Sequence, residues 1–154
     1  MSSDLWSFSL NTYARPGVEA TCLDLQAAGV NVCLLLCGLW LEQRGVTCNE
    51  QRLQQLFQLA SPWELNVVRP LRFLRTQWKT AAANDVQLTA LRERVKSLEL
   101  EAERHLLLQL ERCAQDWPQA EATGLSVWLE GLAAGAANLN RDALHQLRIA
   151  VTDT

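Results

Sequence analysis

Hydrophobic residues recur along this chain of 154 residues at spacings of three and four, and sustained alternation of apolar and polar positions is missing. The first pattern is typical of amphipathic helices, because an α-helix completes one turn in about 3.6 residues. Neither Asn-Gly nor Asp-Gly, the usual hairpin dipeptides, occurs. We therefore predict an all-α fold, a compact bundle of about seven to eight helices in a single domain over residues 1–154.

Turn signals divide the N-terminal part of the chain. Ser3 is placed to cap a first helix that ends at about Tyr13. Pro16 disfavours helical geometry at the residue before it, so a second helix starts there. Gly29 supplies the left-handed position that ends this second helix.

The segment from Asn31, a predicted cap, to Gly45, a predicted stop, is the most apolar of the chain. Its stretch Val30 to Leu41 is apolar on nearly every side, which favours a helix at the centre of the bundle. The stretch is about half as long as a helix that crosses a bilayer. We expect a buried helix here and no membrane span.

Two capping boxes follow, in which a hydroxyl accepts from the amide of a glutamate that in turn accepts from the amide of the cap. Thr47–Glu50 predicts a helix over about 48–60. Ser61–Glu64 predicts a helix that begins at Pro62. Pro70 lacks an amide donor and should kink or restart this helix.

From Asn84, which can cap a helix, to Asp116 the chain contains neither glycine nor proline. Apolar residues three and four apart mark one face of this stretch: Leu88, Leu91, Val95, Leu98, Ala102, Leu106, Leu110 and Cys113. The spacing predicts one long amphipathic helix near 84–116. Two more helices, over about 124–137 and 140–151, complete the prediction.

The composition indicates the class of protein and its cellular compartment. About half of the residues are apolar and a fifth are charged, as in an ordinary globular protein. The N-terminus has no cationic stretch followed by an apolar run, so we predict no secretory signal and a cytoplasmic protein. The five cysteines are odd in number and lie mostly in apolar helical patterns, which is typical of free thiols in a reducing compartment.

Catalytic, cofactor-binding and metal-binding motifs are not found, so we predict no residue for any of these roles. The two histidines, His105 and His145, lie in no local signature of a nucleophile and its base. The cysteines lack the paired spacing of a zinc site. One alternative stays open, an enzyme with a pocket among the helices near Glu99, Glu103 and His105.

The segment between residues 69 and 79 departs from this background. It carries four cations and no acidic residue: Arg69, Arg72, Arg75 and Lys79. On a helix the apolar side chains fall within a sector of about 60°, and the cations occupy the neighbouring 120° or so. The apolar side chains are Val67, Leu71, Leu74 and Trp78.

Such a basic flank can receive phosphates, an acidic partner or an anionic surface. The alternative is that the cations pair inside the molecule with Glu93, Glu99 or Glu103 of the long helix. We predict a non-enzymatic binding protein or adaptor that uses this segment, with Trp63 or Trp78 as an apolar anchor, to hold an acidic protein or a phosphate-bearing ligand.

Two further readings stay open. A nucleic-acid-associated regulator is disfavoured by the net charge of -3 but is a third functional hypothesis. Gly131 and Gly135 permit a close approach of helices, either within the chain or in a homodimer.

Several motifs resemble a known family. They are Leu5-Trp6-Ser7-Phe8-Ser9-Leu10, Tyr13, Pro16-Gly17-Val18, Cys22-Leu23, Leu25-Gln26, Val30-Asn31-Val32, Leu34-Leu35-Leu36, Leu39-Trp40-Leu41, Val67-Val68-Arg69-Pro70-Leu71-Arg72 and Leu98-Glu99-Leu100-Glu101-Ala102-Glu103-Arg104. Over about two-thirds of its length the chain is similar to a group of short proteobacterial proteins, common in pseudomonads, that form an uncharacterised domain of unknown function. The resemblance implies a bacterial cytoplasmic protein, and it carries over no activity, because the family has no established catalytic residues.

Overall fold

The computed structural model describes residues 4–119, 128–133 and 141–152, and within these ranges the regular elements are helices. They run in the order α1 (Leu5–Tyr13), α2 (Val18–Ala27), α3 (Val32–Gln43), α4 (Glu50–Trp63), η1 (Glu64–Val68), α5 (Arg69–Gln77), α6 (Lys79–Ala82), α7 (Val86–Ala114), α8 (Trp128–Ala133) and α9 (Arg141–Thr152). The all-α prediction and the long helix are confirmed. In these ranges no helix is both long and apolar enough to span a membrane.

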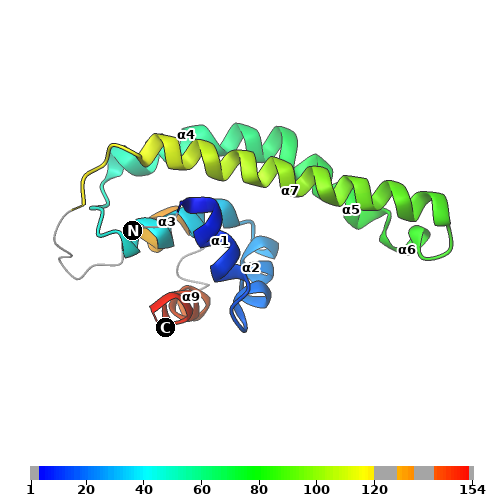
Figure 1. The fold of residues 1–154 in the computed structure, drawn as a ribbon, viewed down its shortest axis with the longest axis horizontal. Coiled ribbons are helices and arrows are strands. Elements are labelled where there is room, and N and C mark those ends of the chain that lie inside the picture. The colour runs from blue at the N-terminus through cyan, green and yellow to red at the C-terminus, as the bar shows by residue number, and fades with distance from the viewer. Residues whose placement is uncertain (1–3, 120–127, 134–140, 153–154) are drawn as a thin grey trace.

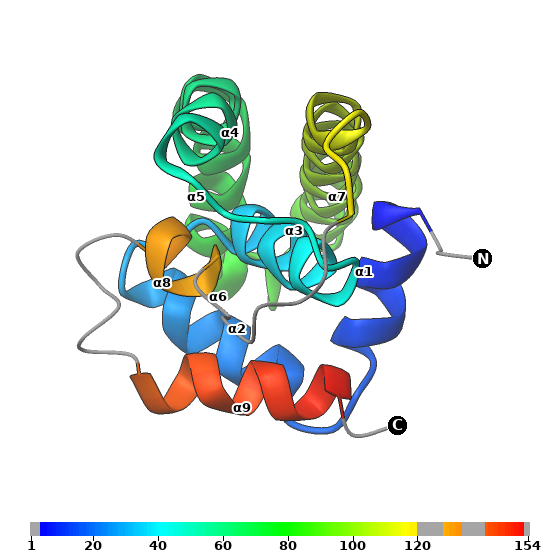
Figure 2. The ribbon, with the colours of Figure 1, turned by 90° about the vertical axis from the view of Figure 1, so that its left-hand side faces the viewer.

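Helix α3 lies at the centre, as its uniformly apolar sequence predicts. Every residue from Cys33 to Leu41 is buried. Figure 2 shows α3 between the α4 and α7 pair on one side and α9 on the other, and α1, α2, α4, α7 and α8 all contact it. Gly38 allows α8 to approach closely, since a Cβ there would lie 2.8 Å from Cδ1 of Leu132.

The glycine predictions and the Asn31 cap are confirmed. Gly29 and Gly45 both have positive φ, at 91° and 70°. Asn31 caps α3 by accepting from the amide of Leu34. Ser3 lies outside the described residues, and the side chain of Asp4 caps α1.

Two other predicted caps are wrong. Asn49, not Thr47, caps α4, because its Oδ1 accepts from the amide of Arg52 at 2.8 Å. Asp85, not Asn84, caps α7 through the amide of Leu88 at 3.1 Å. In both cases an Asx side chain next to the first helical residue reaches the free amide of the first turn.

The second capping box is also wrong, because no helix begins at Pro62. Pro62 lies inside α4, and the chain continues through the π-helical η1 into α5. The amide of Arg69 donates to the carbonyl of Glu64, a spacing of five residues. This wider turn carries the helical run to Pro70, which lacks a donor and stands in the first turn of α5.

The structure describes only part of the C-terminal region for which two helices were predicted. Helix α8 lies within the predicted helix over 124–137, of which the rest lies outside the described residues, and α9 matches the predicted helix over 140–151 to within one residue at each end. Gly131 packs inside the chain, since a Cβ there would lie 2.8 Å from Cδ1 of Leu53. Gly135 lies outside the described residues.

A helical hairpin extends from the rest of the molecule. Figure 1 shows α5, α6 and the first half of α7 side by side, reaching beyond the other helices. We call residues 69–98 the arm and the remaining described residues the body. Leu91 and Leu98, part of the apolar face predicted for the long helix, are about half exposed. The main contacts of α5 and α6 are with α7, with η1 and with each other.

Candidate functional site

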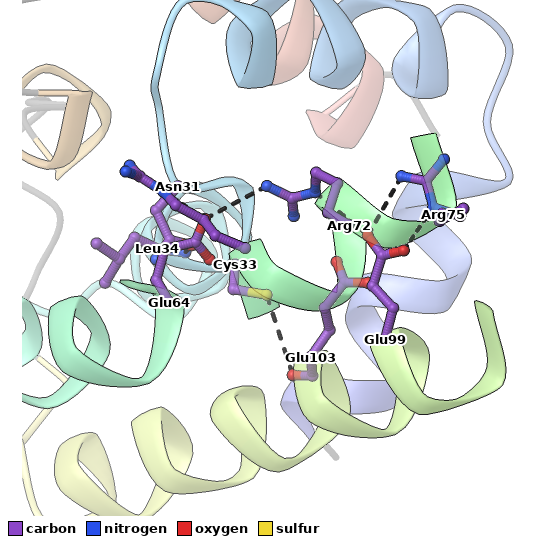
Figure 3. Close-up of polar contacts among 9 residues, drawn as sticks. Asn31, Cys33, Leu34, Glu64, Arg72, Arg75, Glu99 and Glu103 are labelled. Carbon is purple, nitrogen blue, oxygen red and sulfur yellow. Dashed lines mark hydrogen bonds and ion pairs between the residues drawn. The ribbon is translucent and has the colours of Figure 1, made fainter. Parts of the chain in front are cut away.

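Five charged side chains meet where the arm joins the body. Glu64 comes from η1, Arg72 and Arg75 from α5, and Glu99 and Glu103 from α7 (Figure 3). Spacings of three and four place each pair from one helix on a single face. We call these five residues the charge cluster.

The two arginines of the cluster bind two buried glutamates. Arg75 Nε lies 2.6 Å from Glu99 Oε1, and Arg72 Nε lies 3.2 Å from Glu99 Oε2. Arg72 Nη1 also lies 3.3 Å from Glu64 Oε1. Glu64 and Glu99 are only 8% and 6% exposed, so these contacts compensate charges that are largely removed from water.

The predicted basic segment is therefore engaged within the chain to a large extent. Arg72 and Arg75 pair with Glu99, which was one of the proposed internal partners, and Arg69 lies 3.6 Å from Glu64. Lys79 is exposed and forms no ion pair within the part of the chain that the structure describes. Its neighbour Trp78 is half-buried at the junction of α5 and α6.

Sequence reasoning missed Glu64, because it assigned this residue to a capping box. The available signal was the run of helix-forming residues on both sides of Pro62. A helix continued through that proline places Glu64 about two turns before Arg72 on one face. The Gln26 side chain of α2 also faces Arg72, and with its amide oxygen toward the guanidinium it accepts hydrogen bonds from it.

Glu103 is the member of the cluster without an ion pair among the described residues. Its carboxyl lies beside that of Glu99 (Figure 3). Burial, together with the negative charge of Glu99, raises the pKa of Glu103 to about 7, although Arg72 and Arg75 act in the opposite direction. This carboxyl can thus gain or lose a proton near neutral pH.

A groove of about 520 Å³ lies beside the cluster. Helices α1, α2, α3, α5 and α7 all contribute to its lining. Most of the lining side chains are apolar, among them Trp6, Leu10, Leu36, Leu100 and Leu107, and Glu99 and Glu103 are among the charged ones. This size and this mixture are typical of sites for small molecules.

The remaining predicted site residues lie elsewhere. Trp63 is half-buried, and its Nε1 donates to the carbonyl of Ala102 at 2.9 Å. Its ring packs against His105 with centroids 4.6 Å apart. His105 does not line the groove, so the structure brings Glu99 and Glu103 together without the histidine of the predicted trio.

The cysteines offer no reactive thiolate near the cluster. All five are free, and burial raises the pKa of Cys33 well above its ordinary value, so it stays a thiol at neutral pH. Its Sγ faces the backbone carbonyl of Glu103. Among the described residues no group of three or more His, Cys, Asp or Glu side chains is arranged to hold a metal ion.

The arm carries a charge opposite to that of the rest of the chain. Residues 69–98 hold seven of the fourteen Lys and Arg and two of the seventeen Asp and Glu, a formal charge of +5. The other seven cations and fifteen acids give the remainder a charge of -8. Large apolar side chains lie exposed on the same arm, with Phe73 and Val86 at 64% and 87%.

Comparison with known proteins gives a family but no activity. A family model described as "Protein of unknown function (DUF2390)" matches residues 4–110. Searches of the curated proteins and of the solved structures found no match. The matched range contains the groove, the charge cluster and the arm, and it ends before α8 and α9.

Proposed function

The chain belongs to the family described as protein of unknown function (DUF2390), and we propose that it is a non-enzymatic binding protein or adaptor whose basic arm holds an acidic protein. The observation that carries this proposal is the separation of charge, +5 on residues 69–98 against -8 elsewhere. A positive surface steers a negative partner and fixes its orientation.

The exposed cations of the arm, rather than the charge cluster, are the proposed contacts. Arg69 keeps 54% of its side chain exposed, and Lys79 and Arg94 are exposed. Arg72 and Arg75 hold the base of the arm through Glu99, so they support this surface more than they extend it. Trp78 borders it, and in place of Trp63 we propose Phe73 as the apolar anchor.

Exposed apolar side chains favour a protein over a nucleic acid as the partner. Phe73 and Val86 give a protein interface the hydrophobic contacts that a phosphate backbone does not use. The charge of -8 on the rest of the chain also repels a long polyanion. An acidic or phosphorylated segment of a protein matches both features of the arm.

The compartment and source are part of the same proposal. We propose a bacterial cytoplasmic protein with a single domain, because its five cysteines are all free and its motifs resemble proteobacterial sequences. Binding of an acidic protein by the arm does not require the chain to form a homodimer.

Two arginines of α7 give a matched test. Arg94 and Arg112 are both exposed, and Arg94→Glu and Arg112→Glu change the net charge equally, the first on the arm and the second on the body. Partners would be captured from the source bacterium, and the acidic protein recovered would be purified and its affinity for each variant measured. We expect Arg94→Glu to weaken binding about fivefold to tenfold and Arg112→Glu less than about twofold.

Equal losses in the two variants would overturn the proposal, because the contact would then depend on net charge and not on the arm. Recovery of nucleic acid in place of a protein, with binding that falls steeply as salt rises, would instead support the regulator hypothesis.

A further inference from the structure

One carboxyl of the charge cluster, that of Glu103, forms no ion pair among the described residues. Glu64 is paired with Arg72 and, from outside the cluster, with Arg69, and Glu99 is paired with Arg72 and Arg75. Arg75 makes both of its side-chain hydrogen bonds to Glu99, and Arg72 makes its bonds to Glu99 and Glu64. The carboxyl of Glu103 is left over, and it lines the groove.

The cations that line the groove are already engaged. Arg75 is bound by Glu99, and Lys96 Nζ lies 3.3 Å from Glu93 on the exposed side of α7. Glu19 adds a further carboxyl to the lining. The charge that remains to be compensated in the groove is therefore negative, and a cation is the complementary group.

A second polar group of the groove lacks a partner. Ser9 on α1 is 4% exposed and lines the groove, and its hydroxyl has no hydrogen-bond partner among the described residues. A buried polar atom without a partner costs free energy, so such atoms are uncommon in folded proteins. Ser9 is thus a second polar residue at the groove whose hydrogen-bonding capacity the described chain leaves unused.

We infer that the groove binds an amphipathic amine, with its ammonium group at the Glu103 carboxylate and its apolar part against Trp6, Leu36 and Leu107. The ammonium supplies the counterion that Glu103 lacks within the described residues, and its N–H groups are donors for carboxylate oxygens. The apolar walls bury the rest of the molecule. This site is separate from the partner surface proposed for the arm, so either proposal can fail while the other stands.

The proton on Glu103 makes this binding depend on pH. The charged and titratable groups near it are Glu99 on α7, Glu64 on η1, Arg72 and Arg75 on α5, Tyr13 on α1 and Cys33 on α3. Glu19 and Cys22 of α2 and Lys96 of α7 line the same groove. Burial raises the pKa of Tyr13 to about 12, so this group stays neutral. Since an ammonium ion prefers the ionised carboxyl, affinity should rise about tenfold from pH 6 to pH 8 as Glu103, with its pKa of about 7, loses its proton.

Calorimetric titration of the full chain with three ligands of equal length tests the site. The ligands are decylamine, decanoate and decanol, each kept below the concentration at which it forms micelles. At pH 8 we expect decylamine to bind at least about tenfold more tightly than decanoate. Glu103→Gln should lower the affinity for decylamine about tenfold, abolish its pH dependence and leave decanol unaffected.

The control variant is Glu101→Gln, which removes an exposed carboxyl from the same helix outside the groove. Decanoate binding as tightly as decylamine would overturn the inference, and so would equal effects of the two substitutions. The comparison of ligands on the unmodified chain decides the matter even if the Glu103 variant folds poorly.

Discussion

The body and the arm of this chain are built on different principles. The body has a continuous apolar core around α3, and residues of α1, α2, α4, α7, α8 and α9 join it. The arm contributes no residue to that core; its buried apolar side chains are Ala82 and Val95, and charged contacts fix its base. Most of the apolar burial that stabilises the fold therefore lies in the body, while the arm exposes charged and apolar side chains and should open at a lower free-energy cost.

The largest expected change in stability comes from truncating a leucine of the body, and the same truncation on the arm is its comparison. Leu35 in α3 is 1% exposed, and Leu91 on the arm is about half exposed. Leu35→Ala should lower the free energy of unfolding by about 3 kcal/mol, because it leaves a cavity in the core. Leu91→Ala should cost less than about 0.5 kcal/mol. Urea denaturation followed by circular dichroism gives both values, and similar losses would break the comparison.

Removal of Glu99 tests how the arm is held to the body. Glu99→Ala leaves Arg72 and Arg75 without their shared partner, and since both arginines are partly exposed we expect a loss of about 2 to 3 kcal/mol. The exposed Glu93, which pairs with Lys96, is the control, and Glu93→Ala should cost less than about 0.5 kcal/mol. The same denaturation experiment measures both, and a negligible effect of Glu99→Ala would mean that apolar contacts alone fix the arm.

The protonation of Glu103, at the junction of arm and body, should make the stability of the chain depend on pH. Because the folded-state pKa is about 7, above the ordinary 4.5, the folded chain binds more protons than the unfolded chain between these values. The contribution of Glu103 to stability therefore falls as pH rises through that window. We expect a fall on the order of 2 kcal/mol, reduced by the partial exposure of the carboxyl to the groove.

Glu103→Gln should lack this fall and be the more stable protein at pH 8. Unfolding free energies of both proteins at several pH values between 4.5 and 8 measure the difference. A constant difference across that range would show that Glu103 titrates as an ordinary surface carboxyl does.

The smallest expected change in stability comes from removing a helix cap, once in the body and once on the arm. Asn31 caps α3 in the body, and Asp85 caps α7 at the tip of the arm. Each substitution by alanine should cost about 1 kcal/mol. Asn31→Ala should lower global stability, whereas Asp85→Ala should chiefly speed amide exchange in the arm. A global loss from Asp85→Ala would indicate that arm and body unfold as one unit.

The sequence predicts the body better than the junction. A helix that is apolar all round has only one place in a bundle, so the central position of α3 followed from Val30 to Leu41 alone. Gly29 and Gly45 were predictable because few other residues adopt positive φ at low cost. The Asn31 cap was correct, whereas the caps at Thr47 and Asn84 were wrong by one or two residues, since neighbouring residues such as Thr47 and Asn49 are both competent to cap and only the local geometry selects between them.

The candidate site could be predicted only in part, because the sequence pattern does not show which helices pack against each other. Pairing of Arg72 and Arg75 with Glu99 was one of two alternatives, because charge spacing alone does not show which helix packs on which. Glu64 was missed because the capping-box pattern Ser61–Glu64 predicts the start of a new helix, whereas the chain stays helical through Pro62 into η1. The groove requires α1 to lie against α7, a tertiary contact between residues about a hundred positions apart, such as Leu5 and Glu111.

Hydrogen exchange with and without the captured acidic partner tests the division between body and arm most directly. The full chain would be measured by mass spectrometry, which resolves amide protection along the sequence. We predict that the free chain exchanges fastest on the arm and that the partner adds protection at residues 69–98 while the body is unchanged. Added protection confined to α1, α2 and α3, with none on the arm, would contradict the account.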